Sequence, residues 1–188
     1  MTSSLILLFY SKYSDEMNIF FLHKKARKCA KYHCNKHVIK MILETCQILC
    51  TTWHVVDPHH NIYEPVYKKT HINHPSVKWA RESVHHYKWL AELGIMLCKE
   101  YTYRYYKTHK CEQYLISLKN NIPLELPNIE WKDPPQAMPE EFKRKTSIKG
   151  YRKYYTEGKN HIHSWKNRHV PPFLLKNSNK LMALSNVE

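Results

Sequence analysis

The chain has 188 residues, enough for one domain with a buried core and at most a tail. Its residues are 43% hydrophobic and 13% aromatic with only three glycines, which excludes disordered, collagen-like and low-complexity chains. Thirty Lys and Arg against sixteen Asp and Glu give a net charge of +14, which favours DNA or RNA as the partner. An anionic membrane surface and a basic protein without any anionic ligand are the weaker alternatives.

Residues 1–16 look like an appended segment, and Met17 could serve as an alternative start. Their apolar run LILLFY (5–10) is too short to span a bilayer and lacks the basic flank and cleavage site of a signal peptide. We therefore expect no membrane association. The run MNIFFL (17–22) predicts a short buried strand or an extended lead-in.

Long helical segments are expected next. Residues 24–52 lack Gly and Pro and predict one long helix, whereas residues 53–75, with three prolines and clustered histidines, predict an irregular loop. Pro75 suits the first turn of a second long helix that runs to about Tyr106, with a core-facing stripe at three- and four-residue steps.

The remaining segments complete a mainly α fold. A third helix is expected over 111–119, a proline-rich crossing without regular structure over 121–139, and a last helix over roughly 147–167. We expect one compact helical domain with long irregular loops over residues 17–170, followed by a flexible tail over residues 171–188.

The six cysteines lack the paired spacing of a disulfide framework, and several occupy apolar helix positions. They predict free thiols in a reducing, intracellular compartment, the cytoplasm or nucleus of a host cell if the protein is viral. No sequence feature predicts an oligomeric state.

A stripe of titratable residues marks the stretch HCNKHVIKMILE (33–44). At about 100° per residue, His33, His37, Lys40 and Glu44 share one narrow helix face with apolar residues on both flanks. Such a stripe is expected to face a cleft, where burial and neighbouring charges shift pKa values toward neutrality and suit acid–base chemistry or an amine nucleophile. Glu100 joins these four catalytic candidates if it faces the same cleft. The alternative is two hydrogen-bonded core histidines and an ordinary helix ion pair.

A metal site is a weaker reading of the same stretch. Cys29, His33 and His37 recur at four-residue steps, and the loop histidines His59, His60, His71 and His74 could complete a site. No Cys-x-x-Cys pair or intervening general-base glutamate accompanies them. We therefore expect neither a metal nor another cofactor.

Basic and aromatic residues supply candidate DNA contacts. Around the amino end of the second helix, which favours phosphate, they are Lys69, His71, Asn73, His74 and Arg81, and further along is Arg104. In the tyrosine-rich final helix, where rings and cations alternate as in proteins that grip extruded bases, they are Arg152, Lys153, Tyr154, Tyr155 and Lys159. The alternatives are a solvated loop capped by Asn73, a Glu100–Arg104 helix pair, and rings that belong to the core.

Several blocks carry a family resemblance: MNIFFL, HCNKHVIKMILE, THINHPSVKWAR, EYTYRYYKTHK, QAMPEEFK and YRKYYTEGK. They resemble a group of proteins encoded by phages and large DNA viruses. More distantly, the layout is similar to the phage-type pyrimidine-dimer DNA glycosylases, over most of residues 17–168. The resemblance implies a small α-helical enzyme that cuts the glycosidic bond of DNA and nicks the abasic strand.

One departure concerns the nucleophile. The resemblance implies the amino group of a threonine exposed after methionine removal, but here Met17 is followed by the bulkier Asn18 and preceded by sixteen residues. An imine would then have to form on Lys40 or Lys36, with Glu44 or Glu100 polarising the sugar.

The leading hypothesis is a DNA-acting enzyme of the base-excision or base-modification type, with glycosylase and abasic-site lyase chemistry. Two alternatives stay open: a nucleic-acid-binding protein without catalysis, and an enzyme acting on nucleotides or other small phosphorylated substrates.

Overall fold

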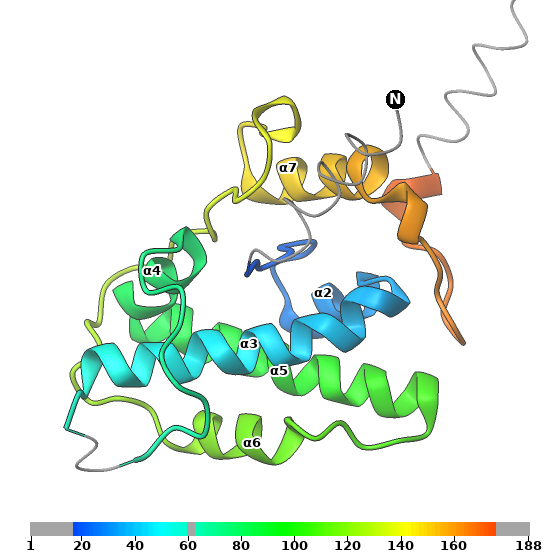
Figure 1. Ribbon diagram of the computed structural model, residues 1–188. Helices are drawn as coiled ribbons and strands as arrows, with labels where there is room; N and C mark the ends of the chain where they lie inside the picture. The colour runs from blue at the N-terminus through cyan, green and yellow to red at the C-terminus, as the bar shows by residue number, and fades with distance from the viewer. Residues whose placement is uncertain (1–16, 60–62, 176–188) are drawn as a thin grey trace, which may run out of the picture.

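The computed structural model describes residues 17–59 and 63–175. Every regular element in these ranges is helical, which confirms the mainly α fold (Figure 1). The α-helices are α2 (Ala26–Tyr32), α3 (Asn35–Val56), α4 (Pro75–Glu82), α5 (Val84–Tyr105), α6 (Glu112–Asn120) and α7 (Ser147–Lys153). Short turns of other helix types are η1 (Glu140–Phe142), the π-helical η2 (Tyr154–Gly158) and η3 (Asn160–Ile162). The appended segment 1–16, His60 and residues 176–188 of the expected tail lie outside the described residues.

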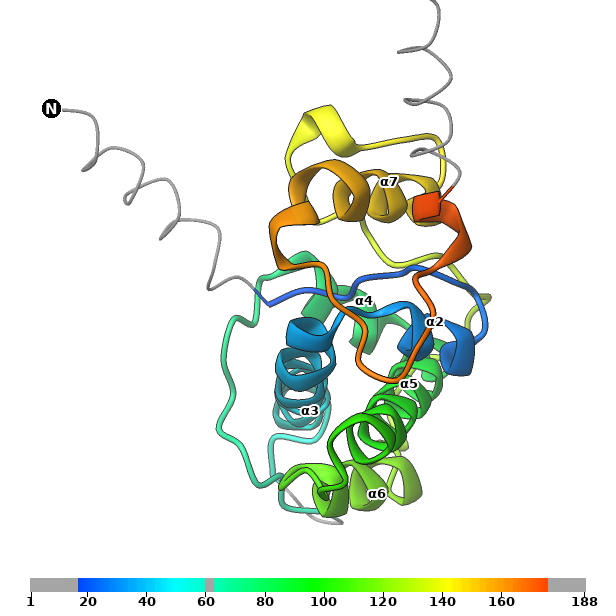
Figure 2. The same ribbon diagram turned by 90° about the vertical axis from the view of Figure 1, so that its right-hand side faces the viewer.

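Helices α3 and α5 form the centre of the fold. They pack against each other, α2 and α6 both pack on α5, and α4 packs against α3 and α5. Figures 1 and 2 show α7 above this helical layer, with the extended lead-in running between the two. In the described part of the chain, none of the helices is both long and apolar enough to cross a membrane.

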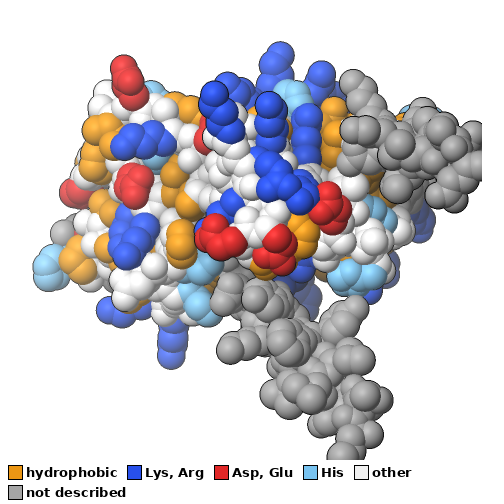
Figure 3. All heavy atoms as spheres, turned by 90° about the horizontal axis from the view of Figure 1, so that it is seen from above, with side chains coloured by type: hydrophobic (Ala, Val, Ile, Leu, Met, Phe, Trp, Pro, Cys, Tyr) orange, Lys and Arg blue, Asp and Glu red, His pale blue; other side chains and the backbone are white. Residues whose placement is uncertain are grey.

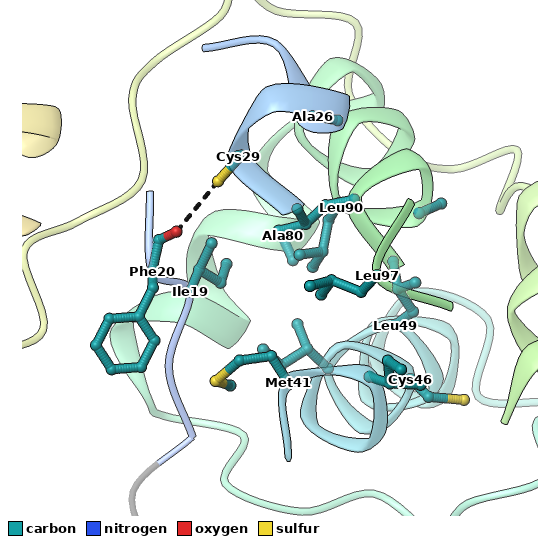
Figure 4. Close-up of a cluster of buried hydrophobic side chains, with 14 of the residues drawn as sticks. Ile19, Phe20, Ala26, Cys29, Met41, Cys46, Leu49, Ala80, Leu90 and Leu97 are labelled. Carbon is teal, nitrogen blue, oxygen red and sulfur yellow. Dashed lines mark hydrogen bonds between the residues drawn. The ribbon is translucent and has the colours of Figure 1, made fainter. Parts of the chain in front are cut away.

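The lead-in 17–22 is extended and almost wholly buried, as expected, but it pairs with no strand in the described ranges. Its side chains alternate between two sides: Ile19 enters the cluster around Leu90 and Leu97, while the ring of Phe20 points away from it (Figure 4). The thiol of Cys29 donates to the carbonyl of Phe20 at 3.2 Å. The lead-in therefore separates the helical core from the side that carries α7.

The single helix expected over residues 24–52 is wrong, because the chain breaks between α2 and α3. His33 and Cys34 are extended, with ψ of 134° and 165°. The buried guanidinium of Arg104 donates to the carbonyls of Lys31 and His33, at 3.2 and 2.9 Å. Arg104 thus hydrogen-bonds to carbonyls that lack a helical N–H partner where the helix is interrupted. The break contains neither Gly nor Pro.

The second expected helix is also interrupted. Ser83 is extended between α4 and α5; its hydroxyl caps α5 by accepting from the backbone of His85 and donates to the carbonyl of Ile129 at 2.7 Å. The third helix agrees with expectation to within a residue. The last is shorter than expected, since α7 gives way to the π-helical η2 and the chain is irregular from His163 to Pro171, before a helical turn at residues 172–175.

Candidate active site

A cleft of about 1110 Å³ opens along the amino-terminal half of α3. Four parts of the chain line it: α3, the lead-in, the start of α4 with the loop before it, and residues 136–162. The lining side chains from the first three are Asn18, Phe20, Lys36, His37, Lys40, Met41, Glu44, His71, His74 and Pro75. Segments far apart in sequence thus meet at one hollow, the usual form of a ligand site.

Helix α3 presents one face to the cleft through His37, Lys40, Met41 and Glu44, at the three- and four-residue spacing of a single helix face. The expected flanks differ from each other. One is buried, but Ile39 on the other is 43% exposed. The face therefore opens beside solvent and is not sealed in the core.

Glu44 is a buried carboxylate at this face. Its Oε2 accepts a hydrogen bond of 3.0 Å from the backbone nitrogen of Asn18, and its Oε1 lies 3.2 Å from Nζ of Lys40. Burial raises the pKa of Glu44, while Lys40, the Asn18 N–H and His71 partly offset that rise. A carboxyl group in this setting can stabilise a cation or exchange a proton.

Asn18 joins two walls of the cleft. Its side-chain nitrogen donates to the carbonyl of Ala137 at 2.8 Å, and its Oδ1 lies 2.8 Å from the hydroxyl of Tyr151. The lead-in is thereby tied to the segment that contains the AMPEEF turn. Asn18 was not predicted from the sequence as a site residue. The one indication was its place in MNIFFL, a block that carries the family resemblance.

His37 is, like Glu44, a buried titratable group in the cleft. Its ring is stacked on Phe20 with centroids 4.2 Å apart, and its Nδ1 lies 2.6 Å from the hydroxyl of Tyr155. Burial lowers the pKa of His37 well below its ordinary value, and the charges of His33, Lys159 and Lys40 act in the same direction. The imidazole is therefore neutral at physiological pH.

Lys159 enters the cleft directly after the π-helical turn η2. Its ammonium lies 5.0 Å from the centroid of the Tyr154 ring, and its side chain is half-buried. Burial lowers the pKa of Lys159, and the charge of Lys40 lowers it further. Single π-helical turns are rare and frequently occur at functional sites, and this one directs Tyr154 and Lys159 to the same wall.

The structure brings only part of the predicted set together. In the cleft are His37, Lys40, Glu44, His71, His74, Tyr154 and Lys159. Outside its lining are His33, Lys69, Asn73, Arg81, Glu100, Arg104, Arg152, Lys153 and Tyr155. Lining residues that sequence reasoning did not select include Gln136, Glu140, Glu141, Lys143 and His161. Those in 136–143 fall within the QAMPEEFK block, whose resemblance was the available signal.

Glu100 belongs to a buried ion-pair cluster away from the cleft. Arg104 donates to its Oε2 at 3.3 and 3.2 Å, and Arg168 donates to both of its oxygens at 2.9 and 2.7 Å. Two guanidiniums occupy this carboxylate, so it attaches the segment around Arg168 to α5.

His33 is fully buried at the break between α2 and α3, where its Nδ1 lies 2.8 Å from the carbonyl of Cys29. The predicted helix face assumed one continuous helix over residues 33–44. Because α2 and α3 are separate helices, His33 does not share the cleft face with His37, Lys40 and Glu44.

Several predicted DNA contacts make contacts within the protein. Arg81 donates to the carbonyl of Ile72, and Arg152 donates to the carbonyl of Leu22 beneath the ring of Phe173. Of the other predicted contacts, Lys69 and Asn73 are exposed and Tyr155 is fully buried. Lys153 forms an ion pair with Glu157.

The residues of the alternative metal site do not converge. The Cys29 thiol donates to a backbone carbonyl, and the Nδ1 atoms of His33 and His37 have separate partners. Across residues 17–59 and 63–175, no three His, Cys, Asp or Glu side chains are grouped as metal ligands.

Comparison with known proteins identifies a family. The model of the pyrimidine dimer DNA glycosylase family matches residues 17–113, more than half of the chain, including the lead-in and the α3 face of the cleft. No curated protein and no solved structure matches the chain significantly. The chain belongs to the pyrimidine dimer DNA glycosylase family.

Proposed function

We propose that the protein releases a damaged base from DNA in this cleft and then cleaves the strand at the abasic site. Membership of the family supports a DNA glycosylase type of function, and with it DNA as the partner. The observation that carries the finer proposal is the pairing, in one cleft, of the half-buried amine of Lys159 with the buried carboxylate of Glu44.

The chemistry needs an amine nucleophile. While Met17 is attached, the nitrogen of Asn18 is an amide and cannot attack a sugar. Lys159 meets the requirement better than Lys40, whose ammonium is paired with Glu44, or Lys36, which is exposed at the rim. Its lowered pKa increases the fraction of free amine, the form that attacks.

The proposed reaction passes through a covalent imine between Lys159 and the sugar. Nζ of Lys159 attacks C1′ of the damaged nucleotide, and the base leaves with the electron pair of the glycosidic bond. Nζ loses a proton to solvent and O4′ gains one from solvent as the sugar ring opens, which leaves a protonated imine whose positive charge the Glu44 carboxylate stabilises. Removal of a C2′ proton then expels the 3′ phosphate, and water releases Lys159 from the imine.

Lysine and histidine side chains around the cleft would hold the DNA backbone. Lys36, His71, His74, Lys143 and His161 belong to its lining. Figure 3 shows the face above α7, where Lys and Arg side chains gather along one edge and acidic ones lie nearer the middle. We propose that phosphates follow the basic positions, including the predicted Lys69 and Lys153, while the damaged nucleotide enters the cleft.

Borohydride trapping on DNA that contains a pyrimidine dimer or an abasic site tests the proposal. The wild-type protein is expected to form a covalent adduct, with mass spectrometry locating the reduced linkage on Lys159. Lys159→Arg should abolish the adduct and keep the charge, whereas Lys36→Arg should retain it.

The other outcomes separate the alternatives. An adduct on Lys40, Lys36 or a newly exposed amino terminus would replace Lys159 as the nucleophile. Binding of damaged DNA without base release or adduct would contradict the enzymatic proposal and favour the non-catalytic alternative. Competition by mononucleotides but not by oligonucleotides would favour an enzyme of small phosphorylated substrates.

We also propose a reducing, intracellular location, in the cytoplasm or nucleus of a host cell if the protein is viral. All six cysteines are free and buried, which supports a compartment where thiols remain reduced. Fractionation of expressing cells, with mass spectrometry of cysteine oxidation in each fraction, would test this.

A further inference from the structure

His37 has a close contact with Tyr155, a residue outside the cleft lining. Tyr155 is fully buried in η2, and its hydroxyl lies 2.6 Å from Nδ1 of His37. The same oxygen accepts a hydrogen bond of 3.2 Å from the backbone nitrogen of Cys34 at the start of α3. Tyr155 thus connects the π-helical turn to the helix that carries the cleft face.

These distances indicate where the protons lie. The Tyr155 oxygen already accepts from the Cys34 N–H, so its own hydrogen is available to a second partner. The Cys34 sulfur at 3.7 Å is a weak acceptor, whereas the imidazole Nδ1 at 2.6 Å is a strong one. With the hydroxyl donating to Nδ1, a neutral His37 carries its hydrogen on Nε2.

The surroundings of His37 disfavour its cation. The titratable groups that act on it come from four places: Lys40 on α3, His33 before it, Lys159 after η2, and His163 in the following loop. All four lower its pKa, and burial lowers it most. The Tyr155 hydroxyl, whose pKa burial raises well above its usual range, stays protonated as the donor.

We propose that Tyr155 is a positioning residue that holds His37 as an Nε2–H donor, and that this donor binds a carbonyl oxygen of the pyrimidine base that leaves. The inference rests on the proposed function and names the group that receives the departing base.

The chemistry of the cleft favours a base over a phosphate at this point. His37 is only 6% exposed and stacked on Phe20, beside the apolar lining residues Met41 and Tyr154. A planar base loses little hydration there, whereas a phosphate would lose much and is better held by Lys36 at the rim. When the glycosidic bond breaks, its electron pair spreads onto the base carbonyls, where a fixed neutral donor stabilises it.

The first experiment determines the tautomer of His37 by NMR and needs no assay of enzymatic activity. In protein labelled with ¹⁵N at histidine, the ring nitrogens of His37 should show a neutral Nε2–H imidazole at neutral pH and still at the ordinary histidine pKa of 6.5. Tyr155→Phe should lose this fixed state, with mixed tautomers or a charge that appears as pH falls. An Nδ1–H tautomer in the wild type, or an unchanged spectrum in Tyr155→Phe, would overturn the positioning role.

The second experiment measures glycosidic-bond cleavage in single turnovers on dimer-containing DNA; in a dimer the cleaved base stays joined to its neighbour, so its release means cleavage of this bond. Tyr155→Phe is expected to slow release roughly 10-fold and to add an acidic limb to the pH profile. His37→Ala should slow release roughly 100-fold, and His37→Gln, whose amide can donate near the Nε2 position, should recover part of the rate.

Tyr87→Phe is the matched control, since it removes another buried hydroxyl, one that lies 3.0 Å from the carbonyl of Leu118, outside the cleft lining. It should match Tyr155→Phe in thermal stability but keep the wild-type rate and pH profile. Equal rates in Tyr155→Phe, His37→Ala, His37→Gln and the wild type would overturn the contact with the base. A wild type that cleaves no glycosidic bond would overturn the proposed function and this contact with it, while the tautomer spectrum would still decide the role of Tyr155.

Discussion

The backbone nitrogen of Asn18 donates a hydrogen bond of 3.0 Å to Oε2 of Glu44, although 26 positions separate the two residues. This bond attaches the lead-in to α3 and fixes the position of the carboxylate in the cleft lining. Because Glu44 is also paired with Lys40, any change at Glu44 acts on both the chemistry and the stability of this region.

Glu44→Gln is expected to remove activity while preserving the fold. Because burial raises the pKa of Glu44, its contribution to stability is complete below its ordinary pKa and is lost as pH rises through the raised pKa. When ionised, Glu44 carries a buried charge with a desolvation cost that glutamine lacks. Base release should fall at least about 100-fold, with a Tm equal to or slightly above wild type.

Thermal unfolding at about pH 5 and pH 7.5 checks the sign, because any advantage of Glu44→Gln should shrink at the lower pH. Lys40→Met is the matched control: it leaves the carboxylate without its cation and should lower the Tm at pH 7.5. A Glu44→Gln protein with wild-type activity would remove Glu44 from the mechanism.

Arg104 is predicted to be among the most costly residues to remove. Its guanidinium is fully buried and donates to Glu100 and to the carbonyls of Lys31 and His33. Arg104→Met leaves a buried carboxylate with one partner fewer and two carbonyls unsatisfied, so the free energy of unfolding should fall by about 3–5 kcal/mol. Chemical denaturation measures this loss, and Arg81→Met, which removes a less buried guanidinium, should cost far less.

The helical class, the third helix and the polar face of α3 were predictable because they follow from local periodicity. The breaks at His33 and Ser83 were not, because distant groups stabilise them: Arg104 satisfies the carbonyls at one, and Ile129 accepts from Ser83 at the other. A pattern based on neighbouring residues cannot register a partner about 70 or 46 positions away.

The candidate site was predictable in part for the same reason. Residues His37, Lys40 and Glu44 follow helical spacing and were found, whereas Glu100 was assigned to the cleft only by its charge. Its position four residues before Arg104 indicated the ion pair that the structure contains. The half-buried setting of Lys159 depends on the π-helical turn, which no sequence period predicts.

Gly94 is predicted to be required by helix packing. A Cβ at this position in α5 would lie 2.7 Å from Cδ2 of Leu115 and 3.0 Å from Cγ2 of Thr45. Alanine would normally stabilise a helix interior by about 1 kcal/mol, but here overpacking between buried helices should outweigh that gain. Gly94→Ala should therefore lower stability by about 1–2 kcal/mol, measured by chemical denaturation; an increase would show that α6 can move away.

The cations at the cleft rim are expected to set the salt dependence of DNA binding. Lys36 is exposed and belongs to the cleft lining, whereas Lys99 is exposed on α5 and does not. If Lys36 contacts a phosphate, Lys36→Ala should weaken binding of damaged and undamaged DNA alike and reduce the slope of log affinity against log salt by about 1. Lys99→Ala removes the same charge and should leave the slope near the wild-type value. Equal slopes for both variants would mean that the DNA backbone does not follow this rim, and fluorescence anisotropy across a salt series separates the two results.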